Sequence, residues 1–261
     1  MRSRHLVALI LTMIAPHAYG VPIISDLATD WSDTQNPNGA WTYTGNSGAL
    51  LGTNQTDWDP SATIFGSPQK AWADSTFSAA GHVHVWFQRT SDSTQLDIAL
   101  GGVGMHGSEG STIAWVGVSW TSSINGTADI TGGVWQALKV TNDGVGGNHQ
   151  NRNSDWRITL NGSVLTGGNV SGLDSFTSLS PFDLLSGSGG ASALTSLAIS
   201  ANDIITLEFI SPTSFATFIG TDFTISAEAR ASVPEPGTFA LIGIGLIALG
   251  MARRRKLGFE V

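Results

Sequence analysis

Cysteine is absent from the 261 residues of this chain. The protein therefore has no disulfide, no thiolate ligand for a metal, no cysteine nucleophile and no cysteine for an N-terminal lipid anchor. Charged residues are also scarce, at 12% of the chain against 41% hydrophobic residues. This balance provides enough apolar side chains for a core and argues against a disordered chain.

Glutamate is rare as well, and only Glu109, Glu208 and Glu228 lie between residues 21 and 230. The chain shows no phosphate-binding loop, no dinucleotide fingerprint and no nucleophile elbow between a strand and a helix. What it has instead is glycine, with 32 residues. A glycine-rich, charge-poor composition favours short strands joined by turns over surface helices.

The first twenty residues have the organisation of a secretory signal peptide. Arg2 and Arg4 supply the positive start, residues 6–15 are apolar, and Ala18 and Gly20 are the small residues expected before a cleavage site. The ten-residue apolar run is too short to span a bilayer comfortably. A buried N-terminal helix is the alternative, but a proline directly after the apolar run opposes it.

Near the other end, residues 237–252 are 16 residues without a charge. As a helix they would extend about 24 Å, which is close to the ~30 Å of a bilayer core. Four basic residues follow at once, and such a cluster favours a cytoplasmic C-terminus. We therefore predict a transmembrane helix that ends at a stop-transfer cluster, namely Arg253, Arg254, Arg255 and Lys256.

A short extended motif precedes this apolar run, since two prolines keep residues 233–236 out of a helix. The motif is Val233, Pro234, Glu235 and Pro236. Followed by an apolar helix and an arginine cluster, it resembles the PEP-CTERM sorting signal. The resemblance implies recognition by an exosortase, removal of the helix, and passage from an inner-membrane-anchored precursor to the cell surface or extracellular matrix of a Gram-negative bacterium. The alternative is a plain C-terminal anchor with a proline-rich linker.

These ends divide the chain into a signal peptide (1–20), a body (21–230) and a sorting tail (231–261). Residues 21–232 hold 18 acidic and 6 basic residues, a net charge of −12. Such an acidic body would repel phosphate groups, which excludes nucleic acid as a partner.

The body shows a repeated strand pattern, with alternating or β-branched runs separated by turn residues. Asn161-Gly162 is a two-residue hairpin signal. The predicted fold is all-β, an antiparallel β-sandwich of jelly-roll type flanked by the signal peptide and the transmembrane helix. The predicted strands are residues 82–88, 95–101, 112–120, 134–140, 155–160, 196–200, 203–210 and 222–229.

Residues 31–43, WSDTQNPNGAWTY, contain Asn-Pro-Asn-Gly-x-Trp-x-Tyr. This stretch, with residues 202–209 and 220–225, resembles β-sandwich domains of other bacterial PEP-CTERM proteins, and the resemblance implies a jelly-roll-like fold. Residues 36–39 predict a turn, after which Trp41 and Tyr43 point to one side of a strand.

His82, His84 and Trp86 share one face of a predicted strand, opposite a face that we assign to the core. Two histidines at this spacing can bind zinc or copper, with His106 or His149 completing the site. A plain polar sheet face is the alternative, and so is the floor of a sugar-binding groove.

The nine tryptophans suggest flat surfaces for stacking on sugar rings. The candidates with polar neighbours are Trp31, Trp58, Trp72 and Trp86, whereas Trp115, Trp120 and Trp135 lie in apolar runs and are expected in the core.

Two acidic segments suit Ca²⁺, namely Asp57 with Asp59, and the oxygen-rich loop 142–148, although each also fits an ordinary turn. Glu109 beside His106 is the best candidate for catalysis, but it lies in a Gly-Ser loop that is poorly suited to hold a catalytic group.

The sequence thus predicts an exported, non-enzymatic surface or matrix protein, structural or adhesive, with weak carbohydrate contact. Its expected partners are an exosortase, the membrane and exopolysaccharide, and no cofactor is expected unless Ca²⁺ binds. A secreted glycan-active enzyme, hydrolase or lyase, is the alternative.

Overall fold

The computed structural model of the chain describes residues 21–45, 48–58, 69–73, 85–90, 96–107, 115–139, 149–212, 217–230 and 242–250. The β-rich body, Val21–Ala229, is one compact unit, and the helix at residues 242–250 belongs to another. All strand pairs are antiparallel and lie within the body.

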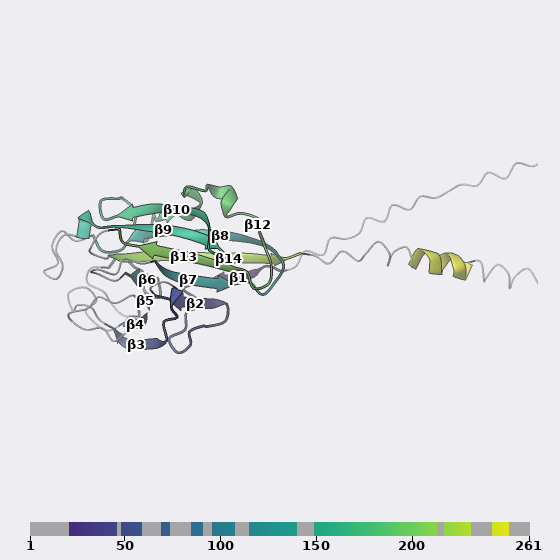
Figure 1. The fold of residues 1–261 in the computed structure, drawn as a ribbon, viewed down its shortest axis with the longest axis horizontal. Helices are drawn as coiled ribbons and strands as arrows, with labels where there is room; N and C mark the ends of the chain where they lie inside the picture. The colour runs from purple at the N-terminus through teal and green to yellow at the C-terminus, as the bar shows by residue number, and fades with distance from the viewer. Residues whose placement is uncertain are drawn as a thin grey trace, which may run out of the picture. The chain divides into compact units, whose positions relative to one another are not determined.

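Nine strands form the larger sheet, in the order β11-β8-β14-β6-β5-β4-β3, with β1 also paired to β14 and β12 to β8 (Figure 1). Their bounds are β1 Ile23–Asp26, β3 Thr53–Trp58, β4 Gln69–Ala73, β5 Val85–Gln88, β6 Val103–His106, β8 Gly126–Gln136, β11 Phe182–Asp183, β12 Leu197–Ile199 and β14 Phe218–Ala229.

Five strands form the smaller sheet, in the order β10-β9-β13-β7-β2. Their bounds are β2 Trp41–Thr44, β7 Val116–Thr121, β9 Asn153–Leu160, β10 Ser163–Ser171 and β13 Ile204–Ile210. The 3-10 turns with all three residues described in the body are η2 His149–Asn151, η3 Leu184–Ser186 and η4 Ala191–Ala193.

The two sheets pack face to face on a shared hydrophobic core, which makes the body a β-sandwich. Trp41, Trp156 and Phe209 enter this core from the five-stranded sheet, and Trp86 and Phe223 enter it from the nine-stranded sheet. Side chains point to alternate faces along each strand, so every second residue of a strand points into this core. The prediction of an antiparallel β-sandwich is therefore confirmed.

A second hydrophobic cluster lies on the opposite face of the nine-stranded sheet. Val85, Phe87 and Trp135 point into it, and Leu96 and Ile98 cover it from the segment before β6. Residues 95–101 were predicted as a strand, but residues 96–99 form none. The prediction was wrong because the apolar alternation of this segment serves to cover a sheet face and not to extend the sheet.

The first and last strands of the body lie side by side. Ile23 in β1 pairs with Ala227 in β14, and β14 bonds along its other edge to β8. The body therefore begins and ends at the same end of the sandwich.

The hairpin between β9 and β10 matches its sequence signal. Asn161 and Gly162 have φ values of 51° and 81°, the left-handed pair that a tight hairpin turn requires. Most of the other predicted strands correspond to β5, β7, β8, β9, β12, β13 and β14.

The Asn-Pro-Asn-Gly segment closes the open edge of β2. The Asn36 side chain accepts a hydrogen bond from Tyr43 N at 2.9 Å and donates one to Tyr43 O at 3.0 Å. Asn38 exchanges two backbone hydrogen bonds of 2.9 Å with Trp41. Trp41 and Tyr43 are both buried on the same side of β2, as predicted.

Candidate functional site

The described part of the tail is the nine-residue helix 242–250. At 1.5 Å per residue it extends about 14 Å. Its apolar side chains are exposed around the helix, namely Ile242, Ile244, Leu246, Ile247 and Leu249. No helix among the described residues is long and apolar enough to cross a membrane. The sorting motif (233–236) and the basic cluster (253–256) lie outside the described residues.

Trp86 is a core residue, and its prediction as a surface ligand-binding residue was wrong. It has no exposed surface, and its ring packs 6.3 Å from Tyr43 and 6.0 Å from Phe209, measured between ring centroids. The predicted alternation holds, since Val85 and Phe87 point the other way. Both faces of β5 are covered, however, so neither is a binding surface.

The histidine site cannot be assembled from the described residues, because His82 and His84 lie outside them. His106 is buried at the end of β6, with its ring 4.5 Å from that of Phe218. His149 lies in η2, and its side chain is outside the described part.

The predicted acidic sites also fall outside the described side chains. Asp57 lies in β3, where only the backbone is described, as does Trp58, and Asp59 and Glu109 are not described. The loop 142–148 is likewise not described. Within the described ranges, no group of three or more histidine or acidic residues is arranged to hold a metal ion.

Asp26 illustrates how the described carboxylates are used. Burial raises the pKa of Asp26, but hydrogen bonds from Thr224 and Thr29 outweigh it and hold the pKa below its ordinary value. Asp26 Oδ2 accepts from Thr224 Oγ1 at 2.7 Å, and Oδ1 accepts from Thr29 N at 2.9 Å. Since donors occupy both oxygens, this carboxylate fixes a turn.

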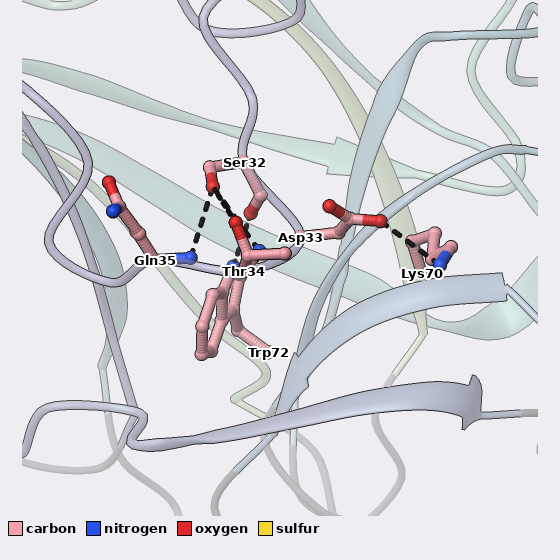
Figure 2. Close-up of polar contacts among 6 residues, drawn as sticks. All are labelled: Ser32, Asp33, Thr34, Gln35, Lys70 and Trp72. Carbon is pink, nitrogen blue, oxygen red and sulfur yellow. Dashed lines mark hydrogen bonds and ion pairs between the residues drawn. The ribbon is translucent and has the colours of Figure 1, made fainter.

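A polar cluster joins the segment after β1 to strand β4 (Figure 2). Trp72 Nε1 donates to Ser32 O at 2.8 Å, and Lys70 Nζ lies 3.0 Å from Asp33 Oδ2. Trp72 is 4% exposed. It is therefore an anchor for this segment and not the surface platform that was predicted.

The remaining tryptophans divide differently from the prediction. Trp120 and Trp135 are buried, as expected. Trp31 is half-buried and packs against the main core, 4.8 Å from the Tyr43 ring. Trp115, expected in the core, is only half-buried, and the Arg157 guanidinium carbon lies 3.9 Å from its ring centroid. The prediction for Trp115 was wrong because side chains alternate along this segment: Val116, Val118 and Trp120 point into the core, so Trp115 lies on the opposite side.

The outer face of the five-stranded sheet carries several polar side chains from neighbouring strands, beside the exposed apolar Val164 and Ile204. Neither hydrophobic cluster lies on it. Strand register arranges its outward residues in three rows across the strands. The rows are Thr42-Ser119-Thr206-Thr159-Val164, Thr44-Gly117-Glu208-Arg157-Gly167 and Ile210-Asp155-Asn169. In the first row Thr159 is buried and the apolar Val164 is exposed.

Hydrogen bonds between neighbouring strands hold these rows in place. Ser119 Oγ and Thr206 Oγ1 are 2.9 Å apart, and Asn169 Nδ2 donates to Asp155 Oδ1 at 2.7 Å. Arg157 Nε donates to Glu208 Oε2 at 2.6 Å. The face therefore presents hydroxyl, amide and carboxylate groups at fixed positions, next to the half-buried Trp115 ring.

Sequence reasoning missed this face. Its residues belong to five strands whose order in the sheet differs from their order in the chain. Alternation in residues 155–160 and 203–210 shows only which residues share a side of each strand. Nothing local shows which side is outward or that the two strands are neighbours.

The described residues thus form a β-sandwich body and, in a separate unit, a short apolar helix. In the comparison with known families, residues 232–256 match the model of the PEP-CTERM protein-sorting motif. The match includes the Pro-Glu-Pro motif and the basic cluster, so the chain carries the signal of an exported protein sorted by an exosortase. No curated protein and no solved structure matches the chain.

Proposed function

We propose that this chain is a precursor exported by its signal peptide and held by its C-terminal helix until an exosortase cuts the tail. The body then acts as a structural or adhesive component of the cell surface or extracellular matrix, in weak contact with polysaccharide. The observation that carries the sorting part is the match over residues 232–256.

Two features of the described residues support this reading. The helix 242–250 exposes apolar side chains around its surface, as expected of a helix that lies in lipid. The outer face of the five-stranded sheet carries polar side chains, with its carboxylates engaged by Arg157 and Asn169. Such a face suits binding better than bond cleavage, because catalysis by paired carboxylates needs one acid and one base free to react.

The sorting proposal is tested in the native host by measuring the intact mass and the cellular fraction of the protein. The wild type is expected outside the inner membrane, lacking residues 1–20 and the tail. The double variant Pro234→Ala/Pro236→Ala is expected to keep the tail and to stay in the membrane fraction. Pro212→Ala, which changes an exposed proline in the body, is the matched control. Wild-type protein that keeps its full tail outside the inner membrane would contradict the proposal.

The enzyme alternative predicts a different result in the same material. Purified body incubated with a polysaccharide panel is expected to release no product. Release of product that is lost in Glu109→Gln would overturn the non-enzymatic assignment.

A further inference from the structure

The outer face of the five-stranded sheet has a repeat that restricts what it can bind. Neighbouring strands lie about 4.8 Å apart, so a row that crosses five strands is about 19 Å long. Along one strand, outward side chains recur only every ~6.7 Å. A pyranose unit in an extended chain advances by nearly the strand spacing, so successive sugar units can meet successive strands only when the chain crosses them.

The groups in the rows match the hydroxyls of sugars. Thr42, Ser119 and Thr206 present hydroxyls in one row, and Asp155 with Asn169 presents a carboxylate and an amide in another. Cross-strand hydrogen bonds fix these groups before any ligand arrives, which reduces the entropy lost on binding. Trp115, held by the Arg157 guanidinium, adds an aromatic surface beside the middle row.

The charges on this face and on the whole body favour a neutral polysaccharide over an acidic one. The one cation of these rows, Arg157, is paired with Glu208, which leaves the charge of Asp155 uncompensated by a basic side chain. Residues 21–232 carry a net charge of −12. The negative charge of the body would repel an acidic polysaccharide, and the rows contain no unpaired basic side chain to bind its acidic groups.

We propose that the outer face of the five-stranded sheet binds a neutral, extended polysaccharide that lies across the strands and occupies about four sugar units. The inference rests on the polysaccharide contact proposed above and specifies its site, its ligand class and its direction.

Titration calorimetry of the body, residues 21–230, tests the ligand class with four probes. Cellohexaose is neutral and extended, maltohexaose is neutral and coiled, hexagalacturonate is acidic and extended, and cellobiose is short. Cellohexaose is expected to bind at least tenfold more tightly than each of the others. Cellotriose, cellotetraose and cellopentaose complete the neutral series, in which affinity is expected to rise with chain length up to about four units and then level off, since the sheet is five strands wide.

Two substitutions test the location. Thr206→Lys places a long charged side chain in the centre of the face, and Thr42→Lys places one on the edge strand, where folding is less at risk. Each is expected to weaken cellohexaose binding at least tenfold. Thr127→Lys, on an exposed position of β8 in the other sheet, adds the same charge and should leave binding unchanged.

The outcomes separate the two proposals. Binding of none of the probes would remove both the polysaccharide contact and this inference. Tighter binding of hexagalacturonate or maltohexaose, or full affinity in both lysine variants, would overturn the inference while leaving a polysaccharide contact elsewhere on the body.

Discussion

At the scale of single residues, Tyr43 shows how the core tolerates a polar group. Its ring lies between Trp31 and Trp86, and its hydroxyl has no hydrogen-bond partner among the described residues. Burial raises the pKa of Tyr43 far above its ordinary value, and the negative charge of Asp30 adds to the effect. The hydroxyl thus carries a desolvation cost that nothing described in the core offsets.

Tyr43→Phe removes this hydroxyl and keeps the ring, so we expect the free energy of unfolding at neutral pH to rise by about 1 kcal/mol. Urea denaturation followed by circular dichroism measures it. Thr221→Val is the matched control, because the buried Thr221 hydroxyl donates to Gly133 O at 3.2 Å. That variant should lose stability. A loss in Tyr43→Phe would show that the Tyr43 hydroxyl has a partner.

The pH dependence of the same pair of proteins has a defined sign. The pKa of Tyr43 is higher in the folded state than its value near 10 in the unfolded chain. The free energy of unfolding is therefore unaffected by the titration of Tyr43 below pH ~10. Above that value it falls by about 1.4 kcal/mol per pH unit, until the pH reaches the pKa of Tyr43 in the folded state. Wild type should lose stability at high pH more steeply than Tyr43→Phe. Since Tyr43 is the only tyrosine in the body, tyrosinate absorbance should appear only as the body unfolds.

At the scale of elements, the edges of the sheets are closed by side chains and loops. The outward backbone groups of β2 bond to Asn36, Asn38 and Leu51, and an open edge would otherwise accept a strand from another chain. Likewise, Asp26 N at the end of β1 donates to Asp30 Oδ2 at 3.0 Å. The Asn-Pro-Asn-Gly segment is thus a structural device that protects an edge.

Asn36→Ala removes both side-chain hydrogen bonds to Tyr43, so Tyr43 N loses its Asn36 partner on this edge, while Tyr43 O keeps the 3.1 Å hydrogen bond from Leu51 N. We expect the free energy of unfolding to fall by about 2–4 kcal/mol, and size-exclusion chromatography to show larger species. Gln35→Ala, at the exposed neighbouring position, should stay within about 0.5 kcal/mol of wild type. Equal stability and size in the two variants would mean that Asn36 does not protect the edge.

At the scale of the whole molecule, body and tail are separate units, and the first and last strands of the body are paired. The sorting motif begins only four residues after Ala229. Four extended residues reach about 14 Å. The proposed cleavage by an exosortase therefore requires an enzyme that accepts a folded domain close to the motif, or one that acts before β14 has joined the sheet.

The division into units predicts that the tail adds nothing to the stability of the body. The full chain in detergent and the body alone in the same detergent should have the same urea midpoint, within about 0.5 kcal/mol of unfolding free energy. Removal of residues 21–26, in contrast, deletes β1 and the 3.0 Å hydrogen bond from Trp120 Nε1 to Ser25 Oγ. That deletion should cost at least about 3 kcal/mol. A body that needed its tail to fold would refute the division.

The sequence by itself determined what depends on residues close together in the chain. The Asn161-Gly162 turn follows from the left-handed backbone that these two residues accept. The strands at 155–160 and 203–210 follow from alternation, which is a property of one strand alone. The sorting tail is a linear signal, read in the order motif, apolar run and basic cluster, and it needs no fold to be recognised.

Only the tertiary structure decided which of the two faces of a strand meets water. Alternation correctly separated Trp86 from Val85 and Phe87, but a second cluster covers the far side of β5, so all three are buried. The polar rows depend on β7, β9 and β13 lying side by side, although they are far apart in the chain. Burial is decided by what packs against a residue, and that partner comes from distant sequence, beyond the reach of any local pattern.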